Sequence, residues 1–132
     1  MLKKLLFTTT LLCATATWAI VPAKTTALHV KQNQTFQIEL VSNPTTGYSW
    51  HWEATKFEEN LVTLVSHKYI ASTHKKLIGA PGREIWTFKA KKGNYRVNQV
   101  GHITMTYSRP WEKNTPPAKT MTVTIVIETR GQ

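Results

Sequence analysis

Apolar and polar residues alternate along most of this chain, and a period of two is typical of half-buried β-strands. In segment 83–90, Trp86, Phe88 and Ala90 share one face. The polar residues 54–60 favour a short helical turn or a loop, and no segment repeats with the 3.6-residue period of a long helix. The alternating or β-rich segments are 26–30, 36–41, 48–53, 61–71, 83–90, 102–107 and 121–128.

This pattern predicts an all-β domain, an immunoglobulin-like antiparallel β-sandwich of 7–8 strands, with a barrel as the alternative. Segment 95–101 follows no clear pattern and has no assignment. In such a sandwich, the loops after the second, fourth and sixth strands gather at one end. We therefore expect loops 43–47, 72–83 and 108–118 to lie together.

The first residues, 1–19, predict a signal peptide. A basic start precedes an apolar stretch that is too short and too rich in threonine for a membrane span, and Ala19 is a small residue at a cleavage position. Cleavage after Ala16 is the alternative. Residues 20–132 would then form a single exported domain, periplasmic or secreted.

The sequence also lacks the common signatures of catalysis. Its one cysteine, Cys13, lies in the predicted signal peptide, and the large Leu12 before it disfavours a lipoprotein signal. Disulfides and thiol chemistry are therefore not expected in the mature domain. There is no nucleophile elbow, paired-histidine motif or Gly-rich phosphate loop. We expect no enzyme activity, no cofactor and no metal site.

The chain is basic, with 17 Lys and Arg against 7 Asp and Glu, for a formal net charge of +10. The basic residues are scattered, which is typical of a solvated surface, and an acidic protein partner is the more specific alternative. Export disfavours nucleic acid as a partner. No later segment is apolar for the length of a membrane span, and we expect a monomer.

The most distinctive stretch is 43–50, Asn-Pro-Thr-Thr-Gly-Tyr-Ser-Trp. Pro44 fixes its own φ, and Gly47 can adopt the positive φ that Thr46 and Tyr48 resist. The small polar tip is thus stiffened at both ends and followed at once by an aromatic strand. Turn chemistry by itself predicts a hairpin-like turn between two strands.

Two further motifs follow in the chain. Gly79-Ala80-Pro81-Gly82 precedes a Trp-rich strand, and Arg109-Pro110-Trp111 lies in a Pro-rich loop. Taken in order, NPTTGY-x-W, G-x-P-G and R-P-W resemble the chagasin family of cysteine-protease inhibitors. The resemblance covers most of the chain beyond its first twenty residues. The chain departs from the family around 95–100, where it is several residues longer.

In this family the first loop enters the active-site cleft of a papain-like protease, and the other two loops grip the cleft from either side. The resemblance therefore implies a reversible, non-covalent inhibitor whose partners are papain-like cysteine proteases. The implied protease-binding residues are Asn43, Pro44, Thr45, Thr46, Gly47, Gly79, Ala80, Pro81, Gly82, Arg83, Arg109, Pro110 and Trp111. The expected supports beneath them are Tyr48, Trp50 and Trp86.

The alternative function is that of an exported immunoglobulin-like binding module for a glycan or an envelope protein. A row of exposed aromatic side chains along one sheet face would favour the glycan.

Overall fold

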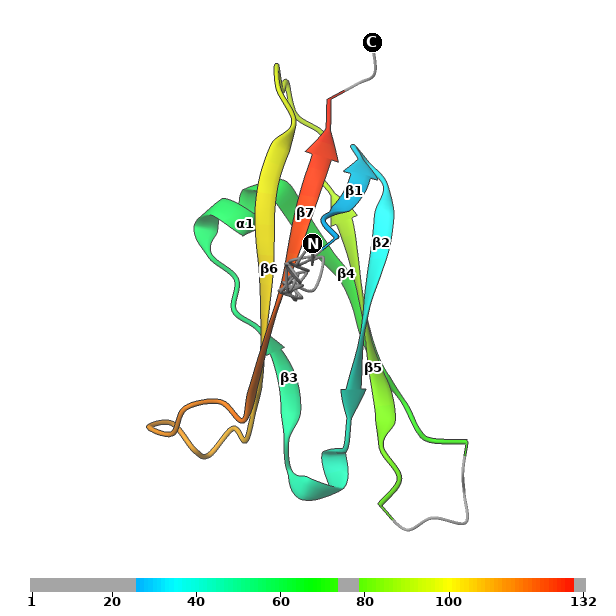
Figure 1. Cartoon of the computed structure of the whole chain (residues 1–132), viewed down its shortest axis with the longest axis vertical. Coiled ribbons are helices and arrows are strands. Elements are labelled where there is room, and N and C mark those ends of the chain that lie inside the picture. The colour runs from blue at the N-terminus through cyan, green and yellow to red at the C-terminus, as the bar shows by residue number, and fades with distance from the viewer. Residues whose placement is uncertain (1–25, 74–78, 130–132) are drawn as a thin grey trace, which may run out of the picture.

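A computed structural model describes residues 26–73 and 79–129 of the chain. Within these residues the chain forms seven strands, one α-helix and one turn of 3-10 helix (Figure 1). The elements are β1 (Leu28–Lys31), β2 (Thr35–Ser42), η1 (Pro44–Thr46), β3 (Ser49–Trp52), α1 (Lys56–Leu61), β4 (Val62–Ile70), β5 (Gly82–Ala90), β6 (Gln99–Ser108) and β7 (Lys119–Glu128).

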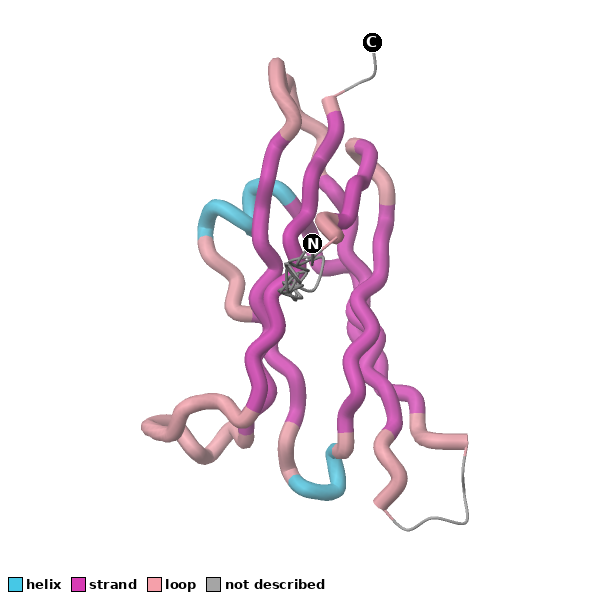
Figure 2. The backbone as a smooth tube through the Cα atoms, viewed as in Figure 1, coloured by secondary structure: helices cyan, strands magenta, loops and turns pink. Residues whose placement is uncertain are grey.

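The strands form two sheets, one in the order β1-β7-β6-β3 and the other in the order β2-β5-β4. Neighbouring strands are antiparallel, except that the short edge strand β1 runs parallel to β7. The two sheets face each other and enclose the core (Figures 1 and 2). The prediction of an immunoglobulin-like sandwich is confirmed, with seven strands.

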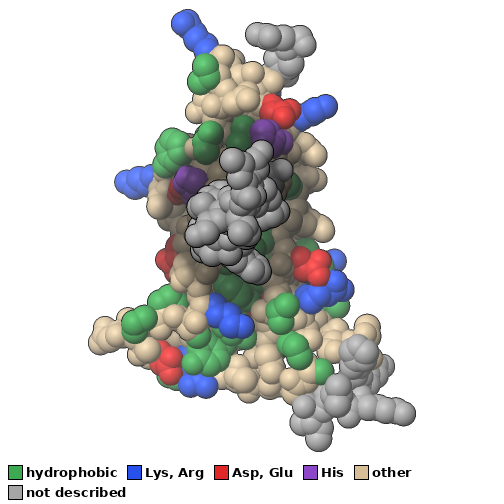
Figure 3. Space-filling model, in the orientation of Figure 1, with side chains coloured by type: hydrophobic (Ala, Val, Ile, Leu, Met, Phe, Trp, Pro, Cys, Tyr) green, Lys and Arg blue, Asp and Glu red, His purple; other side chains and the backbone are tan. Residues whose placement is uncertain are grey.

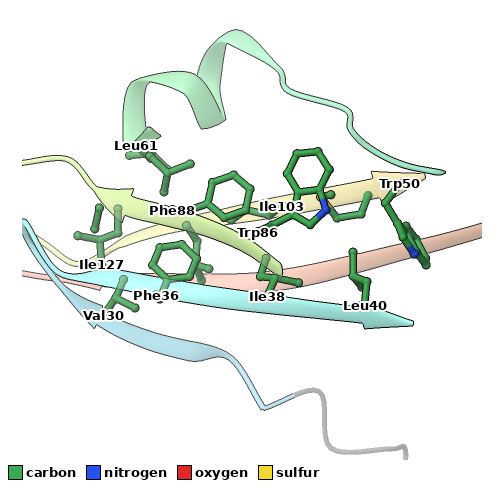
Figure 4. Packing of buried hydrophobic residues seen from close by; sticks show 14 of the residues in the cluster. Val30, Phe36, Ile38, Leu40, Trp50, Leu61, Trp86, Phe88, Ile103 and Ile127 are labelled. Carbon is green, nitrogen blue, oxygen red and sulfur yellow. The ribbon is translucent and has the colours of Figure 1, made fainter. Parts of the chain in front are cut away.

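The core consists mainly of the apolar side chains at alternate positions of the strands, which point between the two sheets (Figure 4). Phe36, Ile38 and Leu40 of β2 are buried, and they face the interior that Ile103 and Ile127 of the other sheet share. Burying each such side chain contributes roughly 1.5–3 kcal/mol relative to leaving it in water. The period of two in the sequence therefore identifies the buried face correctly.

Three local features differ from, or add to, the sequence prediction. The turn at 43–47 joins strands of opposite sheets, since β2 pairs with β5 and β3 pairs with β6, and the hairpin-like reading is wrong. The polar segment after β3 contains helix α1, whose first turn is capped by the hydroxyl of Thr55. Segment 95–101 divides into a loop and, from Gln99, the start of β6.

The connections after β2, β4 and β6 all lie at one end of the sandwich, as expected (Figures 1 and 2). These three connections share one end because successive strands alternate in direction, so that every second connection lies at the same end. This end presents the three sequence motifs on one surface.

Candidate functional site

The tip of the first loop is one turn of 3-10 helix, Pro44–Thr46. Asn43 precedes the turn with φ −128° and ψ 88°, and Gly47 ends it with φ 80°, the left-handed conformation that glycine favours. The amide of Gly47 donates to the carbonyl of Pro44 over 3.0 Å. The expectation of positive φ at Gly47 is confirmed.

Asn43 closes the tip with its own polar groups. Its side-chain Oδ1 accepts a hydrogen bond from Thr45 Oγ1 over 2.6 Å, and its carbonyl accepts from Thr46 Oγ1 over 2.7 Å. The two threonines are exposed, but their hydroxyl protons point back into the turn. Hydrogen bonds within the tip therefore use the hydroxyl protons of both exposed threonines.

Aromatic residues support the tip from below. The hydroxyl of buried Tyr107, on β6, accepts a hydrogen bond from the backbone N–H of Asn43 over 3.0 Å. Its ring stacks on Tyr48, with centroids 5.3 Å apart, and packs at a tilt against Trp50, with centroids 5.0 Å apart. Buried Trp50 donates its indole N–H to the carbonyl of Val41 over 2.9 Å. Tyr48 and Trp50 thus pack around Tyr107 and the end of β2, next to the tip.

The β6–β7 loop lies directly against the tip. Arg109 donates from Nε to the carbonyl of Thr46 over 3.1 Å, and its guanidinium lies 4.3 Å from the centre of the Tyr48 ring. The same guanidinium forms an ion pair with Glu112 within the loop. One side chain therefore joins the two loops through a charge-assisted hydrogen bond and a cation–π contact.

Trp111 lies over Gly47, although 64% of its surface remains exposed. A Cβ atom on Gly47 would overlap the indole of Trp111. Glycine is thus required there twice, for its backbone conformation and for the close approach of the indole. Exposed Trp and Arg side chains side by side are the residue types that dominate binding hot spots.

The β4–β5 loop is described at residues 71–73 and 79–81. Asn43 donates from Nδ2 to the carbonyl of Gly79 over 3.2 Å, so the tip also contacts this loop. Pro81 is exposed beside them. Gly82 and Arg83 begin strand β5, and the guanidinium of Arg83 forms an ion pair with Glu39 on β2.

The structure thus brings all three motifs together around Asn43, Gly47 and Arg109. The contribution of Tyr107 is not evident from the sequence, because its place in a regular alternating strand indicates only core packing. Glu84, a carboxylate among the buried positions of β5, is a second residue near the site that was not predicted. A charged residue in a buried phase was the available signal, because such a residue needs partners to offset its desolvation.

No group of three or more His, Cys, Asp or Glu residues in the described ranges is placed to hold a metal ion. In the same part of the chain, no helix is long and apolar enough to cross a membrane. On the face shown in Figure 3, Lys and Arg side chains are spread over several places instead of forming one patch.

The fold and the loop cluster define an immunoglobulin-like sandwich that presents three joined loops at one end. Residues 29–125 match the profile of the family described as Chagasin family peptidase inhibitor I42. The chain belongs to this family of peptidase inhibitors, and its membership in the family confirms the resemblance seen in the three motifs.

Two relatives, each from a different organism, are similar to the chain in sequence. Amoebiasin-2 of Entamoeba histolytica is 32% identical over 124 residues, which cover 89% of this chain and 93% of the relative. Chagasin of Trypanosoma cruzi is 38% identical over 88 residues, which cover 64% of this chain and 73% of the relative.

Two solved structures resemble the fold. The crystal structure of the cysteine protease inhibitor EhICP2 from Entamoeba histolytica aligns with a TM-score of 0.64 at 30% identity, over 77% of this chain and 86% of that one. The solution structure of Amebosin aligns with a TM-score of 0.52 at 24% identity, over 79% of this chain and 88% of that one, and supports the fold.

Proposed function

We propose that this protein is a reversible, non-covalent inhibitor of papain-like cysteine proteases that inserts the 43–47 loop into the active-site cleft. The observation that carries the proposal is the exposed tip, Pro44–Thr46, which is held by both neighbouring loops in a chain of the chagasin family. A cysteine protease inhibitor among the similar structures supports the same class of target.

The free protein already holds the tip loop in the conformation that we propose for inhibition. Tyr107 holds the tip from below, Arg109 holds it from one side, and Asn43 joins it to Gly79 on the other. Ordering a loop on binding lowers affinity, so a loop that is already ordered retains more of its contact energy. The small side chains of Thr45 and Thr46 suit a cleft that larger side chains would not enter.

The two flanking loops, 72–83 and 108–118, would hold the cleft from either side. Trp111 is the principal anchor on one flank, because exposed Trp next to Arg is a typical composition of binding hot spots. Pro81 is exposed on the other flank. Arg83 would reach a protease by leaving Glu39, at little cost because exposed ion pairs contribute at most about 1 kcal/mol.

The tip is suited to blocking catalysis and not to performing it. The hydroxyls of Thr45 and Thr46 donate to oxygen atoms of Asn43, and neither bonds to a histidine or carboxylate that would activate it. A non-covalent plug is therefore the mode of inhibition that fits these contacts.

Titration of the purified protein into papain with a fluorogenic peptide tests the proposal. We expect tight-binding inhibition that is recovered on rapid dilution, and no effect on trypsin assayed in parallel. Papain that retains full activity at micromolar protein would contradict the proposed function.

The alternative of a glycan-binding module lacks its expected surface. The exposed aromatic residues in the described ranges are Phe57 on α1, Tyr69 on β4 and Trp111 on the β6–β7 loop. They lie on three separate elements, whereas glycan stacking would require neighbouring rings along one face.

We also propose that the protein is exported as a monomer after removal of residues 1–16 or 1–19. The basic start and apolar stretch of the sequence support this proposal. N-terminal sequencing of the exported protein should begin at Thr17 or Ile20, and light scattering should give the mass of one chain. An intact Met1 on exported protein would contradict the cleavage.

A further inference from the structure

Glu84 is a buried carboxylate beneath the tip loop. It lies on β5 in the apolar phase of the strand, and only 3% of its surface is exposed. Among the described residues, the other buried polar side chain is Ser42, whose Oγ donates to Glu84 Oε1 over 2.6 Å. Burying a carboxylate costs several kcal/mol unless hydrogen bonds offset the loss of water.

The contacts of Glu84 Oε1 lie on both stems of the tip loop. Ser42 is the last residue of β2 and immediately precedes the tip, and Trp50 follows it on β3. Oε1 accepts from the Ser42 hydroxyl and from the backbone N–H of Trp50, the latter over 3.3 Å. A single oxygen atom therefore bonds to both ends of the loop.

The link through Glu84 joins two loop stems that no backbone hydrogen-bond ladder joins, because they are in different sheets. β2 and β3 belong to different sheets, so strand pairing does not fix the distance between the two stems. The indole of Trp50 supplies one cross-link, to the carbonyl of Val41. Tyr107, which pairs with Trp50 across β6 and β3, supplies a second link by accepting from the backbone N–H of Asn43. Glu84 supplies a third, through Ser42 and Trp50.

The other carboxylate oxygen faces away from the stems. Glu84 Oε2 pairs with His67 Nε2 over 2.8 Å and accepts from the Trp86 indole N–H over 3.3 Å. His67, on β4, stacks on Trp86 with ring centroids 4.0 Å apart. The carboxylate thus has a loop-facing side and an outward-facing side, and each side can be altered separately.

We infer that Glu84 is a positioning residue for inhibition. Its carboxylate sets the spacing of the two loop stems and so keeps the tip in the conformation that fits the active-site cleft of the protease, which we call the competent tip. The inference rests on the proposed function. Loss of the loop-facing hydrogen bonds should lower the population of the competent tip, and the apparent affinity should fall by the same factor. Loss of the outward-facing bond should lower stability while leaving the tip in place.

The test compares two variants that each change one hydrogen bond to the same carboxylate. Ser42→Ala removes a loop-facing donor, and His67→Gln alters the outward-facing one. We expect Ser42→Ala to raise the papain inhibition constant about tenfold, and His67→Gln to leave it within about twofold at a similar loss of urea midpoint. Equal effects of the two variants on inhibition would show that Glu84 is a core residue and would overturn the inference.

Substitution of Glu84 itself provides the second arm. Glu84→Gln keeps an acceptor for Ser42 and Trp50, whereas Glu84→Ala keeps none, so inhibition should be largely retained in the first and lost in the second. If Glu84→Ala does not fold, Ser42→Ala against His67→Gln still decides the question. Equal inhibition by Glu84→Gln and Glu84→Ala, both folded, would count against positioning.

Amide hydrogen exchange separates this inference from the proposed function. The Gly47 and Trp50 amides should exchange faster in Ser42→Ala than in the wild-type protein, and at the wild-type rate in His67→Gln. A wild-type protein that fails to inhibit papain would end the proposed function, and the exchange rates would still decide whether Glu84 orders the tip. Unchanged exchange in Ser42→Ala would overturn the inference directly.

Discussion

At the scale of single residues, two glycines share one backbone conformation in different surroundings. Gly47 and Gly79 both have φ 80°, but a Cβ atom on Gly47 would overlap Trp111, and one on Gly79 would meet nothing within 4 Å. Any non-glycine residue at such φ costs roughly 1–2 kcal/mol. The pair therefore separates backbone strain from displacement of the indole.

We predict that Gly47→Ala weakens inhibition more than Gly79→Ala does. Both should lower the urea midpoint through strain, but only Gly47→Ala should also displace Trp111 and raise the papain inhibition constant by about tenfold or more. Combining Gly47→Ala with Trp111→Ala should add less than the sum of the two effects, because the overlap is gone. Similar inhibition by the two alanine variants would show that the indole contact has no influence.

The second prediction at this scale concerns Trp111, which rests on Gly47 but is mostly exposed. Trp111→Ala should cost about 2–4 kcal/mol of binding free energy, as truncation of an interface anchor does. The papain inhibition constant should then rise roughly thirty- to nearly a thousand-fold. The urea midpoint should change little, because the indole lies outside the buried core. A large fall in the midpoint with unaltered inhibition would exclude Trp111 from the interface.

At the scale of elements, Arg109 ties the β6–β7 loop to the tip. The guanidinium both donates to the carbonyl of Thr46 and covers the ring of Tyr48, and a Lys ammonium has no planar group to do the two together. We predict that Arg109→Lys weakens papain inhibition by about 1–2 kcal/mol. The measurement is the inhibition constant at two salt concentrations.

The matched control is Lys113→Gln, which removes a charge from an exposed position in the same loop. Arg109→Lys keeps the net charge and Lys113→Gln lowers it. If the control weakened inhibition more than Arg109→Lys did, charge and not loop geometry would explain the contribution of Arg109.

The strands were predictable because a two-residue period records which face is buried. β2, β5 and β6 follow the predicted alternation within a few residues at each end. In β4, buried and exposed residues do not alternate. The strand lies at the edge of its sheet, has an irregularity between Leu64 and Ser66, and is exposed along most of its length. The parallel pairing of β1 with β7 depends on contacts across the whole chain, which a local pattern does not contain.

The motifs of the candidate site were predictable from the sequence, but the hydrogen bonds that hold them in place were not. The φ of Gly47 follows from turn chemistry, and the clustering of the three loops follows from strand order. The bond from Tyr107 to Asn43 joins residues 64 positions apart, and Glu84 bonds to both loop stems from a third strand. Such pairings arise from the packing of the two sheets, so they require the three-dimensional structure.

At the scale of the whole molecule, the fold must be stable without covalent cross-links. The described residues contain no cysteine, and the one cysteine of the sequence, Cys13, lies before them. Stability therefore comes from the apolar core between the sheets and from the hydrogen bonds that join them. This bears on function, because papain-like enzymes need a reduced thiol and are assayed in a reducing agent.

We predict that dithiothreitol leaves the urea midpoint of the purified protein unchanged, and leaves its inhibition constant unchanged at fixed papain activity. Reduction destabilises proteins whose unfolded chain is constrained by disulfides, and a single cysteine cannot form an intramolecular one. A disulfide-rich secreted protein measured in parallel should lose stability and so show that the reductant is active. A shift in this protein would indicate a disulfide between two chains through Cys13. That outcome would contradict both the proposed monomer and the proposed removal of residues 1–16 or 1–19, because only an uncleaved chain retains the thiol.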